Sequence, residues 1–121
     1  MPTQIKSFGS VKIISLDVDE VLRRLRKAAA RLKAHDPSVE AVYLFGSLAR
    51  GEGLPGSDAD LLVVLNENPK TTFERVGDYL EWFSGLGLAV DVFPYTRTEL
   101  RRLRKSSGFV KEALRHKIKL A

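Results

Sequence analysis

Cysteine is absent from the 121 residues, and several other features that would mark a functional class are missing with it. Without cysteine the chain has no disulfide, no zinc–thiolate site and no thiol nucleophile. No apolar run approaches the length of a membrane span, and the N-terminal residues show no signal-peptide core. These absences predict a cytoplasmic protein without a membrane partner. The length predicts one domain, residues 1–121.

Charge is distributed unevenly along the chain, whose formal net charge is +5. Residues 97–121 hold nine Lys/Arg and two Asp/Glu, a local charge of +7, and the other residues hold eleven and thirteen, a local charge of −2. We therefore expect a basic C-terminal helical tail at 97–121. Such a tail attracts an acidic protein, nucleotide phosphates or nucleic acid, of which nucleic acid is not favoured. A solvated helix face and a homo-oligomer stay open as alternatives.

Hydrophobic periodicity predicts an α/β fold, with residues 1–10 as a loose N-terminal arm and 11–16 as a short edge strand. Helical spacing of apolar residues predicts helices at 18–36, 72–83, 98–105 and 109–118. Apolar runs predict core strands at 40–45, 59–65 and 88–93. We expect the helices to cover one side of the sheet.

Three expectations about individual residues follow from these elements. Asp17 should cap the first helix, with Glu20 completing a capping box. Phe73 and Leu80 should lie on the buried stripe of the helix at 72–83. Pro94 should end the third core strand.

Residues 42–65 carry the features that indicate chemistry. They comprise an apolar strand, a Gly-Ser turn, a glycine-rich loop and a second strand that begins with two carboxylates. Asp58 and Asp60 are two residues apart, so an extended backbone sends both side chains to the same face. Such carboxylates repel each other unless a cation lies between them, and hard oxygen ligands suit Mg²⁺. Gly46 and Ser47 end the preceding strand, where free N–H groups and a hydroxyl suit phosphate oxygens.

A third carboxylate strengthens this interpretation. Asp91 lies within the apolar strand at 88–93, where we expect it to be buried. A buried carboxylate needs a compensating charge or several donors. Convergence with Asp58 and Asp60 on one metal site explains it more simply than a structural arginine does. Together these residues predict phosphoryl or nucleotidyl transfer.

The pattern resembles a known family. Gly46-Ser47, ten intervening residues and Asp58-Ala59-Asp60 resemble the signature of the DNA polymerase beta superfamily of nucleotidyltransferases. The fuller string is similar to the minimal nucleotidyltransferase (MNT) branch, and Val90-Asp91-Val92 matches the place of its third carboxylate. The resemblance covers residues 41–95. It implies a small mixed β-sheet packed by helices, whereas the sequence alone would also allow a parallel sheet.

The resemblance implies an enzyme that transfers a nucleoside monophosphate, expected to be AMP from ATP, to a hydroxyl and releases pyrophosphate. The implied catalytic residues, which would also hold two Mg²⁺ ions, are Asp58, Asp60 and Asp91. The implied nucleotide-binding residues are Gly46, Ser47, Arg50 and Ser57. Ser57 is expected to cap or orient Asp58. Arg50 has two further interpretations, an ion pair with Glu52 and a solvent-facing side chain.

The resemblance also implies a partner. MNT proteins of this size are often the antitoxin of a toxin–antitoxin pair whose toxin is an all-helical HEPN ribonuclease, and they can add AMP to it. A protein nucleotidyltransferase with a HEPN-type partner is therefore the leading hypothesis. Two alternatives stay open: a non-catalytic binding antitoxin with a relic site, and an enzyme that modifies a small molecule such as an aminoglycoside. The intact set of carboxylates argues against a relic, since nothing would then hold three like charges together.

Overall fold

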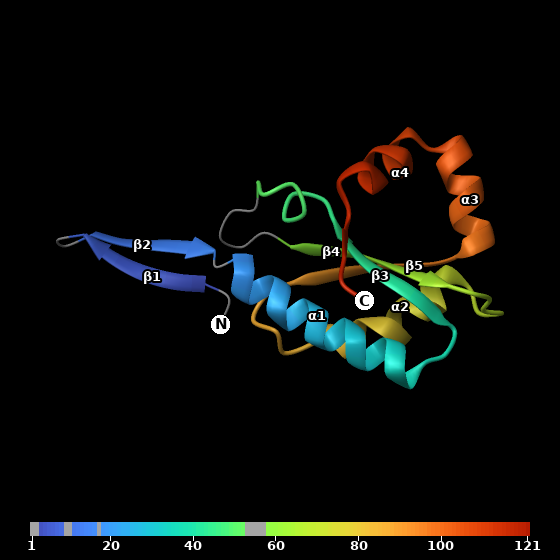
Figure 1. The fold of residues 1–121 in the computed structure, drawn as a ribbon, viewed down its shortest axis with the longest axis horizontal. Coiled ribbons are helices and arrows are strands. Elements are labelled where there is room, and N and C mark those ends of the chain that lie inside the picture. The colour runs from blue at the N-terminus through green and yellow to red at the C-terminus, as the bar shows by residue number, and fades with distance from the viewer. Residues whose placement is uncertain (1–2, 9–10, 17, 53–57) are drawn as a thin grey trace.

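The computed structural model describes residues 3–8, 11–16, 18–52 and 58–121 and shows a mixed α/β fold (Figure 1). Over these residues the central sheet has four strands in the order β5-β4-β3-β6. Their bounds are β3 Val39–Phe45, β4 Ala59–Leu65, β5 Val90–Thr96 and β6 Ile118–Lys119. Strand β3 pairs antiparallel with β4 and β6, whereas β4 and β5 are parallel. The mixed sheet implied by the resemblance is therefore confirmed.

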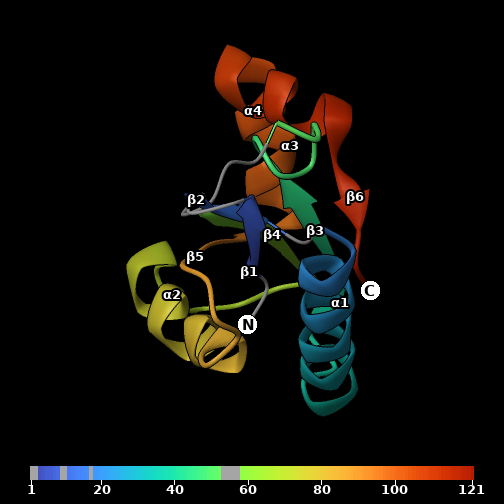
Figure 2. The same ribbon diagram turned by 90° about the vertical axis from the view of Figure 1, so that its left-hand side faces the viewer.

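Helices cover both faces of the sheet (Figure 2). On one side lie α1 (Val18–His35), α2 (Thr72–Leu80) and the short 3-10 helix η1 (Glu81–Phe83). On the other lie α3 (Arg97–Ser106), α4 (Gly108–Ala113) and the 3-10 helix η2 (Leu114–His116). In the part of the chain that the structure describes, no helix is long and apolar enough to cross a membrane.

The prediction that all helices lie on one side is wrong, and the reason is visible in β3 and β4. Both strands are apolar on both faces. The larger core lies on the face that α1 covers and includes Leu25 of α1, Val42 of β3 and Leu61 of β4. A smaller cluster on the opposite face includes Phe45 and Leu62 and packs against α3 and α4. Strands buried on both faces need cover on both.

Helix α1 starts and ends close to the predicted bounds, although Asp17, its predicted cap, lies outside the described residues. Its buried residues recur at helical spacing: Val21, Leu25, Ala28, Ala29 and Leu32. Burying each large aliphatic side chain contributes about 1.5–3 kcal/mol relative to exposure. The amphipathic pattern therefore suffices to place α1 against the sheet.

The predicted buried stripe of α2 is wrong at two positions. Phe73 is 89% exposed and Leu80 is 38% exposed, whereas Tyr79 is 4% exposed. Tyr79 can be buried because its hydroxyl donates to Asp36 Oδ2 at 3.0 Å, which satisfies its polar end. Periodicity alone could not reveal this hydrogen bond, because its acceptor lies far away in the sequence.

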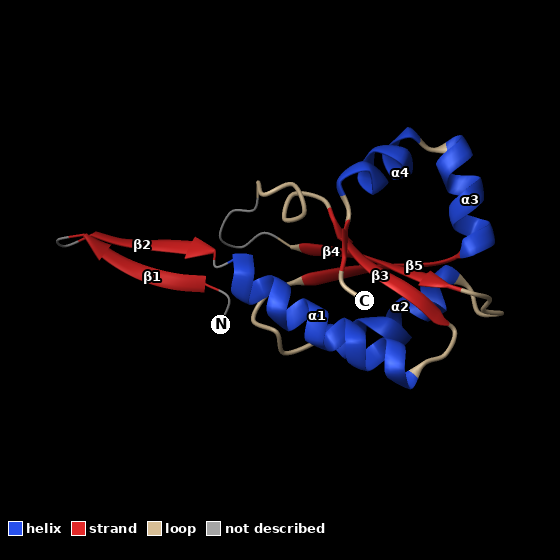
Figure 3. Ribbon diagram, in the orientation of Figure 1, coloured by secondary structure: helices blue, strands red, loops and turns tan. Residues whose placement is uncertain are grey.

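Pro94 does not end the third core strand, which extends to Thr96 (Figure 3). Strand β5 lies at an edge of the sheet, and Pro94 is paired with Val63 of β4. An edge strand tolerates proline because one side of its backbone needs no ladder hydrogen bonds. Helix α3 begins at Arg97, directly after the strand and one residue before the predicted start at 98, and Thr96 and Glu99 form its capping box.

The N-terminal residues form a hairpin. Strand β1 (Thr3–Phe8) pairs antiparallel with β2 (Val11–Leu16), and the hairpin extends beyond the N-terminal end of α1 (Figure 1). The loose arm predicted for residues 1–10 is therefore wrong over Thr3–Phe8. Residues 11–16 form a strand as predicted, but they pair with β1 and not with the central sheet.

The C-terminal residues return to the sheet. The helix predicted at 109–118 is α4 followed by η2, and Ile118–Lys119 forms β6 instead. Leu120 is buried and its N–H donates to the Val42 carbonyl at 2.8 Å, while Ala121 accepts from the Val42 N–H at 3.0 Å. Residues 97–121 are therefore helical only in part, and their end is folded against β3.

Arg75 joins three elements at the C-terminal end of β5. Its buried Nη1 donates to the Pro94 carbonyl at 3.3 Å and to Glu99 Oε1 at 2.5 Å, and its Nη2 donates to the Asn68 carbonyl at 2.9 Å. Glu99 also accepts from the Thr96 N–H at 2.8 Å. This network fixes α2 and the start of α3 to the end of the sheet.

Replacing Arg75 with alanine should lower the free energy of unfolding by about 2–4 kcal/mol, because two carbonyls and a carboxylate lose a buried donor. Arg26→Ala removes an exposed arginine from α1 and should change stability by no more than about 0.5 kcal/mol. Urea unfolding of both variants measures the difference. Equal effects would contradict a structural role for the Arg75 network.

Acid should weaken the same network. Burial by itself raises the pKa of the Glu99 carboxyl, but hydrogen bonds from Arg75 and Thr96 lower it more, so the pKa lies below its ordinary value of 4.5. The folded state then binds fewer protons than the unfolded state, so this stability is complete above about pH 4.5 and is lost as pH falls through the lowered pKa. Urea midpoints measured from neutral to acidic pH should fall less steeply for Glu99→Gln than for Glu67→Gln, which removes an exposed carboxylate.

Candidate active site

Strand register places two predicted catalytic residues side by side. In the parallel pairing of β4 with β5, Asp60 lies directly beside Asp91. In the antiparallel pairing of β3 with β4, Asp60 lies opposite Phe45, which precedes Gly46. Alternation puts these side chains on the face that α3 and α4 partly cover. Asp58 comes two residues before Asp60, just ahead of β4.

The expectation that Asp91 is buried is wrong: its side chain is exposed. Strand β5 is an edge strand, and the described apolar cover from α3 and α4 lies further along the strands, at Phe93 and Tyr95. The argument that Asp91 must bind a cation because it is buried therefore fails. Its position beside Asp60 supports a cation site instead, because two like charges lie on neighbouring strands with no basic side chain between them in the ladder.

The pKa of Asp60 reflects the charges of both other aspartates. Partial burial raises the pKa of the Asp60 carboxyl, and the negative charges of Asp91 and Asp58 raise it further. The positive charge of Arg50 acts in the opposite direction. The raised pKa means that this arrangement disfavours three ionised carboxylates unless a further positive charge joins them.

The donor set fits a hard divalent cation in its chemistry, since it consists of carboxylate oxygens that repel one another. Among the described residues, however, no three His, Asp or Glu side chains are gathered closely enough to enclose an ion. Asp58, Asp60 and Asp91 therefore have the right chemistry, and Asp60 and Asp91 share a face of the sheet, but the three side chains would have to close further around a metal.

Gly46 lies against the carboxylate of Asp60. Its φ is +78°, and a Cβ at this position would collide with Asp60 Oδ2. The following residues form a short helical turn, in which the Arg50 N–H donates to the Gly46 carbonyl at 3.2 Å. The first N–H groups of such a turn have no acceptor within it. The turn and the carboxylates therefore face the same small region.

Arg50 and Ser57 were predicted as further nucleotide-binding residues. Arg50 Nε pairs with Glu52 Oε2 at 3.2 Å, and its side chain is 40% exposed. The ion pair with Glu52 is one of the alternatives predicted for Arg50. The charge of Arg50 also acts to lower the pKa of Asp60, which indicates that its side chain lies near the carboxylates. Ser47 is half-buried at the start of the turn. Ser57 lies outside the described residues.

Two aromatic residues beside the carboxylates were not singled out from the sequence. Phe45 and Phe93 lie edge to face, with ring centroids 5.2 Å apart. Phe45 is opposite Asp60 in the register, and Phe93 is two residues after Asp91 on the same face. The sequence could have indicated both residues, because Phe45 directly precedes Gly46 and Phe93 lies two residues after Asp91. Once the strands are paired, these positions lie on the same face as the carboxylates.

The nucleotidyltransferase domain family matches residues 22–120, which include every described residue of this site. The chain belongs to the nucleotidyltransferase domain family. The resemblance drawn from the Gly-Ser and Asp-x-Asp motifs is thereby confirmed, as is the assignment of the chain as a nucleotidyltransferase. The predicted roles of the individual site residues stay predictions.

Two proteins of Methanocaldococcus jannaschii are similar to this nucleotidyltransferase. "Putative protein adenylyltransferase MJ1379" is 34% identical over 77 residues, which cover 63% of this chain and 73% of that protein. "Putative protein adenylyltransferase MJ1215" is 38% identical over 74 residues, which cover 60% and 80%.

Solved structures support the fold. A crystal structure described as "a putative nucleotidyltransferase from Sulfolobus solfataricus" aligns with a TM-score of 0.63 and 24% identity, covering 84% of this chain and 80% of that chain. At this identity the likeness concerns the fold alone. A chain of a toxin–antitoxin complex solved with AMP-PNP aligns with a TM-score of 0.49 and 21% identity, covering 88% and 73%, a likeness too low to bear on function.

Substitutions of Gly46 and Gly51 distinguish the effect of backbone strain from the effect of contact with Asp60. Gly46 and Gly51 have φ of +78° and +73°, but a Cβ at Gly51 would meet nothing within 4 Å. Alanine at either position should cost about 1–2 kcal/mol of unfolding free energy, because an L side chain is strained there. Gly46→Ala should also displace Asp60 and abolish binding of ATP with Mg²⁺ in calorimetry. If Gly51→Ala weakened nucleotide binding equally, the contact between Gly46 and Asp60 would have no role in it.

Proposed function

We propose that this nucleotidyltransferase is a Mg²⁺-dependent protein adenylyltransferase that transfers AMP from ATP to a hydroxyl of a partner protein. The observation that carries the proposal is the juxtaposition of Asp60 and Asp91 on parallel strands, with the Gly46 turn against Asp60. Identity to two proteins described as protein adenylyltransferases supports the choice of a protein acceptor.

In this proposal, each residue of the site has a role that follows from its position. The turn at Gly46 and Ser47 would hold the β- and γ-phosphates with backbone N–H groups and a hydroxyl, and Arg50 would add a positive charge beside them. Phosphates held there lie at the edge of the site next to Asp60. The α-phosphate would then face Asp60 and Asp91 together. Positioning of this kind provides most of the rate in phosphoryl transfer.

The acceptor hydroxyl approaches from the side of Asp91, which is exposed and therefore reachable. Its oxygen forms a bond to the α-phosphorus while the bond between that phosphorus and the β-bridging oxygen breaks, and pyrophosphate leaves with the electron pair. Asp91 accepts the proton of the hydroxyl. Two Mg²⁺ ions, held by Asp58, Asp60 and Asp91, would supply the positive charge that neutralises the phosphates and the leaving group.

The partner in this proposal is a HEPN-type toxin, with the chain acting as its antitoxin. The motif resemblance to the MNT branch supports it.

Asp91→Asn tests the catalytic proposal. The substitution is nearly isosteric, removes one of the facing negative charges, and should leave stability unchanged or slightly raised. Binding of ATP with Mg²⁺ should largely survive, because Gly46, Ser47, Asp58 and Asp60 are intact. Transfer of labelled AMP to the protein encoded by the neighbouring gene should fall by a factor of about 10²–10³.

Asp78→Asn is the matched control, since it removes an exposed carboxylate from α2 that pairs with Lys70. It should transfer AMP as the parent does. Inhibition of the partner is measured in parallel. A parent protein that inhibits fully without detectable transfer, and an Asp91→Asn variant that inhibits equally well, would falsify the enzymatic proposal in favour of simple masking.

A further inference from the structure

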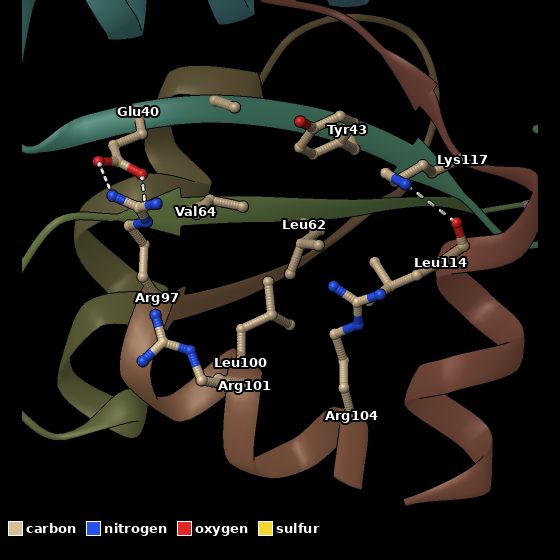
Figure 4. Close-up of a pocket in the computed structure, with 11 residues that line it drawn as sticks. Glu40, Tyr43, Leu62, Val64, Arg97, Leu100, Arg101, Arg104, Leu114 and Lys117 are labelled. Atoms are coloured by element: carbon tan, nitrogen blue, oxygen red, sulfur yellow. Dashed lines mark hydrogen bonds and ion pairs between the residues drawn. The ribbon is translucent and has the colours of Figure 1, made fainter.

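A cavity of about 370 Å³ lies between α3 and the face of the sheet that carries Asp60 (Figure 4). Its floor is apolar and includes Leu62 of β4, two residues beyond Asp60 on the same face, with Leu100 of α3 opposite. Arg101 and Arg104 of α3 and Lys117, ahead of β6, also line it. We call this cavity the cationic groove.

The positive charges of the cationic groove are not all neutralised. Arg97 at one end pairs with Glu40 at 3.2 Å. Lys117 Nζ donates to the Leu114 carbonyl at 3.2 Å and lies 5.5 Å from the centre of the Tyr43 ring. For Arg101 and Arg104, by contrast, the described part of the chain provides no ion pair. An anionic ligand would therefore find two guanidinium groups three residues apart on one helix face.

The cationic groove continues towards the carboxylates. A neighbouring apolar cavity of about 230 Å³ shares Leu62, Leu100 and Leu114 with it and is also lined by Phe45 and Phe93. These two rings flank Asp60 and Asp91 in the strand register. A ligand that enters at α3 can thus lie along one face, with cations at one end, an apolar stretch in the middle and the carboxylates at the other end.

We propose that the cationic groove binds an acidic segment of the acceptor protein, and that the adjacent apolar cavity takes a hydrophobic side chain next to the modified hydroxyl. The identity of the occupant as the acceptor rests on the proposed function. Charge complementarity favours a carboxylate-bearing peptide, because no described acidic residue pairs with Arg101 or Arg104 and the floor suits aliphatic side chains.

A single-stranded nucleic acid fits these observations less well. Sequence-tolerant binding of that kind uses aromatic rings on which bases stack. The aromatic residue lining the cationic groove is Tyr43, which is only partly exposed, and Lys117 already lies over its ring. Leucine and valine side chains of the floor provide no stacking surface.

The test measures binding without ATP or Mg²⁺, so it does not depend on catalysis. The probe is a fluorescein-labelled synthetic peptide with one tyrosine, two leucines and a run of glutamates, followed by fluorescence anisotropy. Arg101→Glu/Arg104→Glu should weaken binding by roughly tenfold or more, and raised salt should weaken binding to the parent. Arg102→Glu/Lys105→Glu is the matched control, because both residues are exposed on α3 and neither lines the cationic groove. It should retain at least a third of the parent's affinity.

Several results would overturn the proposal. Equal losses in the two double variants, or equal binding of a peptide with glutamine in place of glutamate, would reduce the effect to non-specific attraction. A single-stranded RNA oligomer that displaces the peptide and loses affinity only in Arg101→Glu/Arg104→Glu would assign the cationic groove to nucleic acid. Self-association in light scattering that only this variant abolishes would assign it to a second copy of the chain.

Folding and catalysis are checked separately. Both double variants alter exposed residues, and their urea unfolding should match that of the parent; Arg101→Gln/Arg104→Gln repeats the test if the charge reversal unfolds the protein. Peptide binding that depends on Arg101 and Arg104, with no AMP transfer to any acceptor, would refute the proposed function and leave the cationic groove as a docking site. AMP transfer to the partner that is unaffected by the variant would refute the groove proposal alone.

Discussion

Strand β4 is the constraint on which the rest of the structure depends. Its two edges are paired with β3 and β5, and both of its faces are covered, so its seven residues can hold almost only apolar side chains. Asp60 is the exception in that strand, and it is found where the cover from α3 and α4 has ended. The site thus exists because one strand begins before the second helical layer reaches it. Moving Asp60 one residue along would turn its carboxylate into the larger core.

The local elements could be predicted from the sequence wherever one physical signal decided them. The amphipathic spacing of α1 and the apolar runs of β3 and β4 placed those elements within a residue or two. The enzyme class was equally readable, because the Gly-Ser turn and the Asp-x-Asp pair together resemble the signature of the family that matches the chain. The motifs could not show that Asp60 and Asp91 are direct neighbours; this follows from the parallel pairing of β4 with β5.

Several errors share one cause, which is contact between residues distant in the sequence. Tyr79 replaces Phe73 in the interior because Asp36 accepts its hydroxyl hydrogen bond. Arg75 is buried because Asn68, Pro94 and Glu99 converge on it. The cationic groove has the same origin, since Lys117 joins Arg101 and Arg104 only after the chain has turned back towards β3. A charge count along residues 97–121 detects an excess of positive charge but not a cavity.

The two edges of the central sheet are protected in different ways. An open edge strand offers unpaired donors and acceptors to the edges of other molecules, which is a common route to aggregation. On one side, Pro94 interrupts the row of N–H donors along β5. On the other side, β6 pairs with β3 at Tyr43 and Leu44, and Leu120 and Ala121 extend this contact to Val42. The last residues therefore act as a cover for β3, and their loss would expose an apolar strand to edge-to-edge association.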